Sequence, residues 1–252
     1  MKAYSEFFLS DTHFPFEDKA AWAVTLKTIR KLQPAIIWLG GDIMDMYKVS
    51  HWEKDPRRKE SLQDELNYTF ERLSEVRAAA PNARIFFKEG NHETRLTRYL
   101  NSRAKELRSL KALELPELLS LSDLDIEWIG NFNKYKIGGL WHIHGNEIYG
   151  RNPWQKYNRL GVSAIYGHHH ERAVYYHRTY TDTVNEIWAN PCLCDLEPDY
   201  DHHPNWSQGF TVIEHYANDR FHIQPVNLEI IQGQKIGRLY GQVISEEIFK
   251  AA

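Results

Sequence analysis

The first third of the chain alternates short apolar runs with longer amphipathic segments, and this alternation restricts the possible folds more than any other feature. The apolar runs are typical of buried strands, and the segments between them place apolar residues at helical spacing. Strands are expected at residues 4–9, 35–39 and 84–88, and helices at 18–32 and 61–80. This order predicts a parallel sheet, because each helix crosses over the sheet before the next strand begins.

In later segments, apolar residues recur at a shorter spacing. Beyond residue 125, apolar and polar residues alternate, which predicts strands at 126–129, 134–137, 140–144, 164–167, 173–176, 186–189, 210–215 and 221–226. Residues 94–121 show helical spacing, with Leu96, Leu100, Leu107 and Leu110 directed inward. From residue 227 onward, a short strand and a terminal helix are expected. The chain is therefore predicted to be an α/β protein in which two sheets pack on each other.

The length, composition and net charge of the chain limit the classes of protein to which it can belong. The 252 residues are 42% hydrophobic, which is enough for one domain with a sizeable core. The net charge of −3 argues against a protein that binds nucleic acid mainly through charge. Residues 54–111 nevertheless carry 14 Lys and Arg against 9 Asp and Glu. This excess predicts either a basic face for a phosphate-bearing ligand or ordinary solvated helix faces.

Neither a membrane segment nor a disulfide framework is indicated. The longest apolar stretch, residues 35–39, is far too short to cross a bilayer, and Glu6 and Asp11 interrupt the start before a signal peptide could form. We therefore expect a cytoplasmic protein with no membrane partner. Cys192 and Cys194 are two positions apart, which predicts small buried side chains rather than a disulfide, although they could also help to hold a metal.

Polar clusters stand where predicted strands end. They combine aspartate, asparagine and histidine, and most of them contain glycine. They are D-T-H at Asp11 and His13, G-G-D-I-M-D at Asp42 and Asp45, G-N-H-E at Asn91 and His92, H-G at His144, and G-H-H-H at His168 and His170. Ligands of open α/β sheets bind beyond the carboxyl ends of the strands, so these clusters are expected to share one crevice.

These side chains carry the donor atoms of a metal site. Aspartate together with imidazole favours Mn, Fe or Zn over Mg or Ca, whose sites are almost entirely oxygen. The clusters hold more donors than one ion needs, so a shared carboxylate could bridge two ions about 3.5–4 Å apart, an arrangement used for in-line attack on phosphorus. A one-metal hydrolase that uses His168 and His170 alone is the alternative interpretation.

The ordered set D-x-H, G-D-x-x-D, G-N-H-E, H-G and G-H-x-H, from Asp11 to His170, resembles the signature of the calcineurin-like metallophosphoesterases. The resemblance implies an α/β fold in the form of a four-layer α/β/β/α sandwich, with two packed mixed sheets flanked by helices. It also implies a single domain over residues 1–252. Helical cap-like segments are expected near 46–75 and 95–121, and a C-terminal extension near 228–252.

The family pattern implies a role for each matching residue. A first metal would be held by Asp11, His13, Asp42 and His170, and a second by Asp42, Asn91, His144 and His168, with Asp42 bridging. His92 would be the general acid, and Asp45 would hydrogen-bond His92 and favour its protonated form. The nucleophile would be a metal-bound water or hydroxide. The expected cofactors are two divalent ions, Mn²⁺ first, with Fe, Zn or Ni as alternatives.

The resemblance implies a metal-dependent phosphoesterase but leaves the substrate open between a phosphomonoester and a phosphodiester. The segment G-D-I-M-D-M-Y lacks the arginine that follows the second aspartate in Ser/Thr protein phosphatases, which argues against that branch. Segments 46–59 and 95–108 are expected to overhang the crevice, which makes Arg95, Tyr47 and His51 candidate substrate contacts. A nuclease acting on DNA or RNA is the first alternative. A non-catalytic metal- or phosphate-binding protein of the same fold is the second.

Structural roles compete with these assignments at several positions. Asp11 and Asp42 could cap helices, Asn91 could serve only a turn, and Asp45 could be an exposed acid at a helix start.

The same holds for residues beside the motifs. His169 alternates with the proposed ligands and is expected to point away from them, while Glu93 is expected to support its loop. Aromatic side chains outside the motifs could stack on a base or simply pack locally; they are Tyr149, Trp154 and Trp206. Other histidines match no motif and are expected at the surface or in packing, namely His142, His202 and His203.

Overall fold

A computed structural model describes residues 3–198, 204–246 and 249–251, so the prediction for His202 and His203 lies outside the described residues. The first sheet has six strands in the order β11-β10-β1-β2-β3-β4. The parallel strands are β1 (Tyr4–Leu9), β2 (Ile36–Leu39), β3 (Arg84–Lys88) and β4 (Ile126–Ile129). The antiparallel strands are β10 (Gly209–His215) and β11 (Phe221–Asn227). The predicted parallel sheet is confirmed, and the late strands extend it along one edge.

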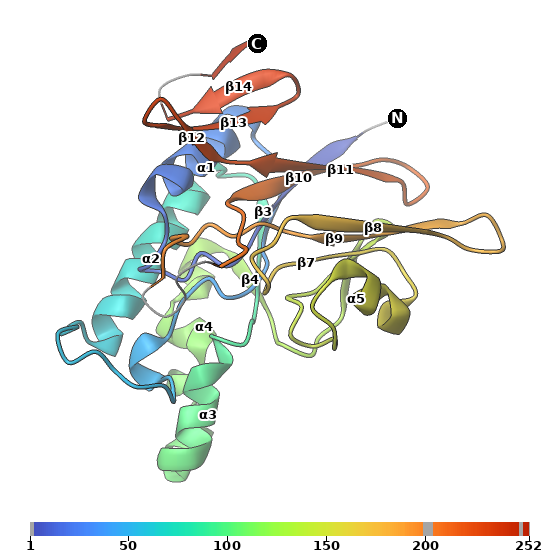
Figure 1. Cartoon of the computed structure of the whole chain (residues 1–252). Helices are drawn as coiled ribbons and strands as arrows, with labels where there is room; N and C mark the ends of the chain where they lie inside the picture. Colours follow the sequence, from blue (N-terminus) through green and yellow to red (C-terminus); the bar gives the residue numbers. More distant parts are fainter. Residues whose placement is uncertain (1–2, 199–203, 247–248, 252) are drawn as a thin grey trace.

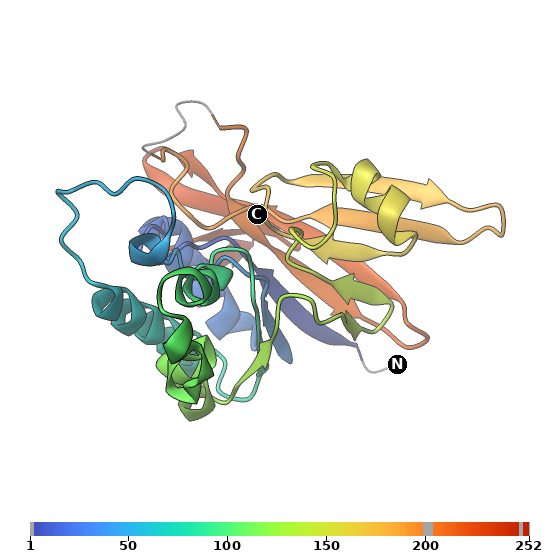
Figure 2. The same cartoon turned by 90° about the horizontal axis from the view of Figure 1, so that it is seen from below.

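A second sheet of five strands, in the order β5-β6-β7-β9-β8, packs on the first. Its strands are β5 (Tyr135–Ile137), β6 (Leu140–His142), β7 (Ala164–Tyr166), β8 (Ala173–Arg178) and β9 (Val184–Ala189). The layer between the sheets is apolar, since Phe8 and Trp38 share one buried cluster with Leu140 and Ile165. Figure 2 shows the β8–β9 hairpin extending beyond the body of the molecule.

Helices cover the outer face of each sheet and complete four layers (Figure 1). Helices α1 (Lys19–Leu32) and α2 (Leu62–Ala79) pack on the first sheet in the largest buried cluster. Helix α5 (Pro153–Leu160) packs on the second sheet through Tyr157. The chain therefore has the expected four-layer α/β/β/α architecture with two mixed sheets.

Local sequence explains where these helices begin. The Asp18 carboxylate accepts the Ala21 N–H at 2.8 Å and caps α1, and Ser61 forms a capping box at the start of α2. Helix α5 was not predicted, although Asn152 caps it and Pro153 occupies its first position. Its eight residues are too few to display a clear helical period, so only these end signals could have found it.

The prediction of a helix across residues 94–121 is partly wrong. Helix α3 (Thr94–Arg103) ends where Ala104 leaves the helical region, with φ −149° and ψ 56°. Short turns follow, namely η2 (Lys105–Ser109), η3 (Lys111–Leu113), α4 (Leu115–Leu118) and η4 (Leu121–Leu124). Because the helical register is lost at Ala104, Leu107 and Leu110 are about half exposed, whereas Leu96 and Leu100 are buried as expected.

The end of the chain also differs from the prediction. In place of a terminal helix, the described residues form a four-stranded antiparallel sheet. Its strands are β12 (Glu229–Ile231), β13 (Gln234–Leu239), β14 (Gln242–Ser245) and β15 (Phe249–Ala251). Leu239 and Ile244 join the buried cluster that includes α1. Left-handed glycines at Gly233 and Gly241 form the turns between strands, and these were the missed signals. None of the helices in the described part of the chain has the length and apolar character needed to span a membrane.

A buried carboxylate ties the two sheets together. Glu6 in β1 is fully buried, and its two oxygens each lie 2.7 Å from an imidazole nitrogen, Nε2 of His142 in β6 and Nε2 of His215 in β10. Burial raises the pKa of Glu6, but its interactions with His142 and His215 outweigh burial and lower the pKa to about 2. His142 is thus a packing residue, as expected.

Glu6→Gln is expected to reduce the free energy of unfolding by about 3 kcal/mol near neutral pH, the equivalent of the shift in pKa. Because the folded pKa is depressed, this stabilisation is complete above the ordinary value of 4.5 and is lost as the pH falls toward about 2. Urea unfolding of both proteins near pH 7 and near pH 3 tests this, with Ser5→Ala as control. A difference that is as large in acid as at neutral pH would contradict the prediction.

Candidate metal centre

Loops from both sheets meet at the edge where their strands end. Strands β1, β2 and β3 lead to Asp11, Asp42 and Asn91, while β6 and β7 lead to His144 and His168. A cavity of about 250 Å³ opens there. Six residues of the sequence motifs line it, namely His13, Asp42, Asn91, His92, His168 and His170. The buried Asp11 and His144 contact these residues, Asp11 at 3.4 Å from His170 and His144 at 3.2 Å from Asp42. The structure therefore brings all the residues of the five motifs together.

Asp11, His13 and His170 form one group of possible metal ligands, with donor atoms within 4.8 Å of one another. The Nε2 atoms of His13 and His170 are 3.2 Å apart, and His170 Nε2 lies 3.4 Å from Asp11 Oδ1. All three residues are buried. Two imidazole nitrogens and a carboxylate oxygen thus converge on one point, which is a donor set suited to a divalent transition metal.

Asp42, His144 and His168 form a second such group within the same limit of 4.8 Å. His144 Nε2 lies 3.2 Å from Asp42 Oδ2 and 3.1 Å from the side-chain oxygen of Asn91. Asp42 also groups with His13 and His92, so it lies between the two sets of donors. The geometry suits a carboxylate shared by two ions.

The environment of His168 tests whether a cation fits. Its Nδ1 is buried and has no hydrogen-bond partner among the described residues. Burial and the neighbouring charge of His144 lower the pKa of His168 to about 3, which keeps the ring neutral. Neutral imidazole is the form that coordinates metals, and a buried polar atom without a partner is costly unless a ligand completes it. The residues therefore fit a metal ion.

The backbone at these candidate ligands is strained. Left-handed φ angles occur at five of them, namely Asp11 (54°), His13 (51°), Asp42 (51°), His168 (71°) and His170 (59°). Such angles are uncommon outside glycine and gather at functional sites, where surrounding contacts hold them. One of these contacts joins the sheets, because the His168 N–H donates to Asp11 Oδ1 at 2.9 Å.

Two motif glycines are required by close packing against the ligands. A Cβ atom at Gly90 would lie 2.3 Å from Asp42 Oδ1, and one at Gly167 would lie 2.4 Å from Asp11 Oδ2. Any side chain at either position would therefore push a carboxylate out of place.

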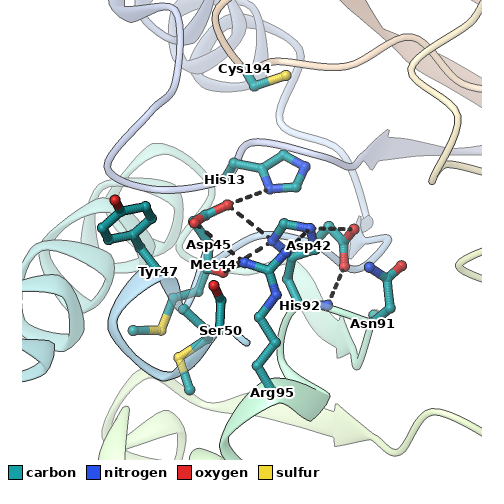
Figure 3. Close-up of polar contacts among 12 residues, drawn as sticks. His13, Asp42, Met44, Asp45, Tyr47, Ser50, Asn91, His92, Arg95 and Cys194 are labelled. Carbon is teal, nitrogen blue, oxygen red and sulfur yellow. Dashed lines mark hydrogen bonds and ion pairs between the residues drawn. The ribbon is translucent and has the colours of Figure 1, made fainter. Parts of the chain in front are cut away.

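His92 lies beside the ligands in a polar network (Figure 3). Its Nδ1 lies 3.0 Å from Asp45 Oδ1, which is also 3.2 Å from His13 Nδ1. Burial lowers the pKa of His92, but the carboxylates of Asp42 and Asp45 outweigh burial and raise it above its usual value. Burial raises the pKa of Asp45, and its hydrogen bonds with the two histidines hold it well below its usual value. Asp45 therefore favours the charged form of His92, whereas Arg95, which can only donate, lies 2.9 Å from His92 Nε2 and favours an unprotonated nitrogen there.

Glu93 holds two of the ligand loops in place. Its buried carboxylate accepts four backbone N–H bonds, from Asp42 and Gly90 at one oxygen and from Ile43 and Met44 at the other, at 2.8 to 3.0 Å. The expectation that Glu93 supports its loop agrees with these bonds.

Glu147 braces the His144 loop in a similar way. It accepts the N–H groups of His144 at 3.2 Å and Gly145 at 2.7 Å, and it pairs with the buried Lys88 at 3.0 Å. Sequence reasoning missed this pair. The available signal was an acidic residue three positions after the histidine, the spacing that separates Gly90 from Glu93.

Glu93→Ala is expected to weaken Mn²⁺ binding by roughly 10–100-fold, the usual effect of removing a group that orients metal ligands. Four backbone N–H groups lose their acceptor, and the loop that carries Asp42 is then free to shift. Calorimetric titration with Mn²⁺ measures the effect, and Glu71→Ala on the exposed side of α2 is the matched control. Equal Mn²⁺ affinity in Glu93→Ala and Glu71→Ala would refute the bracing role.

His170 contacts an aromatic ring and a thiol. The Trp206 ring packs edge-on with its centroid 4.3 Å away, and Cys194 Sγ lies 3.8 Å from His170 Nδ1. Cys192 and Cys194 are buried free thiols, as the sequence predicted in place of a disulfide. Together with His170 they also form a group of possible metal ligands.

The candidate substrate contacts lie in different places. Arg95 lies beside the site, with Nη2 2.9 Å from His92 Nε2. Tyr47 and His51 are not among the residues that line the cavity. The Tyr47 hydroxyl instead accepts the Asp55 N–H within its own loop, and His51 packs on Trp52. His169, expected to point away, lines the cavity beside His168.

Comparison with known proteins gives distant relatives and a shared fold. No model of a known protein family matches the chain. The chain is 24% identical over 245 residues to the Gene 54 protein of Mycobacterium phage L5. The aligned part covers 90% of this chain and 93% of that protein. The Gene 54 protein of Mycobacterium phage D29 matches with the same identity and coverage.

Among solved structures, Vacuolar Protein Sorting 29 from Cryptosporidium parvum superposes with a TM-score of 0.51 at 10% identity, covering 96% of this chain and 98% of that one. At this identity the match shows a shared fold. The chain thus shares the fold of Vacuolar Protein Sorting 29, and its own clustered aspartate and histidine side chains could hold metal ions.

Proposed function

We propose that the protein is a two-metal hydrolase of phosphoester bonds. The observation that carries this proposal is the pair of adjoining donor groups, Asp11 with His13 and His170, and Asp42 with His144 and His168. Asn91 adds an amide oxygen to the second group. A non-catalytic binding protein does not need both complete groups with a histidine, His92, beside them.

The proposed ligands are those of the sequence analysis. Asp11, His13 and His170 hold one divalent ion, Asn91, His144 and His168 hold the other, and Asp42 contributes to both. When bound, the two ions polarise the phosphoryl oxygens and lower the pKa of water so that it can attack phosphorus. Mn²⁺ is the first choice for both sites, with Fe, Zn or Ni as alternatives.

His92 supplies the proton in this proposal. A protonated His92 donates to the leaving-group oxygen, and Asp45 orients the ring and stabilises its positive charge. Arg95 lies against Nε2 of the same ring, so a leaving group that reaches this nitrogen must displace the guanidinium. The displaced Arg95 then faces the substrate, where it can donate to a phosphoryl oxygen.

The test is metal-dependent turnover of simple esters. Protein stripped with a chelator is assayed with p-nitrophenyl phosphate and with methyl p-nitrophenyl phosphate, before and after addition of Mn²⁺. We expect hydrolysis only with metal, and the preferred ester distinguishes a monoesterase from a diesterase. The opposite result is a protein that binds two ions and still hydrolyses neither ester with Mn²⁺, Fe²⁺, Zn²⁺ or Ni²⁺. That result would contradict the hydrolase and would identify a metal-binding protein without this activity.

A further inference from the structure

A second cavity adjoins the metal centre. It measures about 440 Å³ and lies between the loop at 145–151, the first turn of α5, and the pair His168 and His169. Cavities of this size accommodate small organic ligands. Three residues line both cavities, namely Arg151, His168 and His169, so a ligand held at the metal centre can extend into the second cavity.

The walls of this second cavity combine an aromatic ring with a cation. The Tyr149 side chain is 81% exposed, and the Arg159 guanidinium lies 5.8 Å from its ring centroid. The Arg151 side chain is 68% exposed and stands where the two cavities meet, 2.8 Å from Glu171. The exposed aromatic ring offers a stacking surface, and Arg151 can reach an oxygen of a phosphate bound at the metal centre.

Asn146, which lines the second cavity, carries a hydrogen-bond acceptor without a partner in the described part of the chain. The side-chain oxygen of Asn146 is buried and has no partner among the described residues. The ammonium group of Lys156 does not serve it, since its bonds go to the carbonyl oxygens of Gly145 at 2.6 Å and Ile148 at 2.8 Å. A purely apolar substrate group would leave the Asn146 oxygen unsatisfied, whereas a group that carries an N–H would complete it.

These features differ from those of a second phosphate site. The buried Asn146 oxygen would repel an anion within the second cavity, and Arg151 lies at the boundary with the metal centre, since it lines both cavities. A flat ring with N–H groups on its edge, attached to one phosphate, can stack on the aromatic wall and donate to the acceptor. A nucleobase has this chemistry.

We infer that this second cavity is a nucleoside subsite, so that the phosphoester cleaved at the metal centre belongs to a nucleotide or a nucleic-acid strand. This inference rests on the proposed phosphoesterase function. In this arrangement Tyr149 stacks on the base, Asn146 accepts from its edge, and Arg151 binds the phosphate that joins the nucleoside to the metal centre.

The test compares two diesters with the same leaving group, thymidine 5′-(p-nitrophenyl phosphate) and methyl p-nitrophenyl phosphate, with Mn²⁺. We expect kcat/KM to be at least about tenfold higher for the nucleoside ester, the effect of one stacked base. Tyr149→Ala is expected to remove most of this preference through KM. Tyr180→Ala, in the exposed turn between β8 and β9, is the control and should keep the preference.

Each outcome is decisive for the subsite. Hydrolysis of both esters at equal rates, or a full preference retained in Tyr149→Ala, would overturn it while the phosphoesterase function stands. No hydrolysis of either diester would also overturn the subsite, and p-nitrophenyl phosphate in the same assay then shows whether the phosphoesterase function itself stands. Cleavage of a single-stranded oligonucleotide that also depends on Tyr149 would support the subsite for a strand, and a preference confined to the nucleotide ester would support it for free nucleotides.

Discussion

Asp42→Ala is expected to lose metal binding and phosphoester hydrolysis together. Asp42 is the carboxylate that lies between the two donor groups, 3.2 Å from His144 and grouped with His13 and His92. In the proposed site, its removal takes one ligand from each ion and leaves buried histidines around an incomplete site. We therefore expect metal content to fall from two ions per chain to fewer than one, and turnover to fall to the rate without protein.

A second variant, Asp42→Asn, distinguishes loss of metal binding from loss of the fold. Asp42 also accepts the His92 N–H at 2.8 Å, so alanine could disturb the loop itself. Asp42→Asn keeps the side-chain shape and an acceptor for this N–H, but it lacks the negative charge that two cations need. Metal content by atomic emission and circular dichroism are measured for both variants, with the exposed Asp123→Ala as control. A folded Asp42→Asn protein that retains two ions and full turnover would contradict the bridging role.

His92→Ala is expected to retain both ions and to lose roughly 10²–10⁴-fold in turnover of esters with poor leaving groups. The loss should shrink as the leaving group becomes more acidic, because p-nitrophenolate departs with little need for a proton. A series of substituted phenyl esters measures this as a steeper dependence of log kcat/KM on leaving-group pKa in the variant.

The matched control for His92→Ala is His222→Ala, a histidine on the exposed side of β11 that lies outside the site. We expect His222→Ala to keep the slope of the unmodified protein. Added imidazole is expected to restore part of the His92→Ala rate, which a merely structural role would not allow. An unchanged slope in His92→Ala, with metal content intact, would refute the general-acid role.

Sequence patterns predicted those parts of the fold that depend on local signals. The alternation of strands and helices before residue 90 gave the parallel sheet, and the ordered motifs placed Asp11 and His168 at strand ends, which the structure joins through a hydrogen bond of 2.9 Å. The order of strands in the second sheet carried no such signal, because pairing between distant segments depends on tertiary packing.

Features that depend on tertiary contacts could not be predicted. Leu107 and Leu110 fit a helical period, yet the helix ends at Ala104 and leaves both about half exposed. The pair of Lys88 with Glu147 joins the end of β3 to the His144 loop, and the spacing of Glu147 from His144 does not reveal Lys88 as its partner. Arg151 lines both cavities from a loop that leads into α5, a helix that packs on the second sheet.

The central claim concerns two adjacent cations held by residues that are distant in the chain. Anomalous diffraction at the manganese edge, from crystals grown with Mn²⁺, tests it most directly. The account predicts two peaks, one touching Asp11, His13 and His170 and the other touching Asn91, His144 and His168, with Asp42 in contact with both. A single peak, or peaks remote from Asp42, would contradict it.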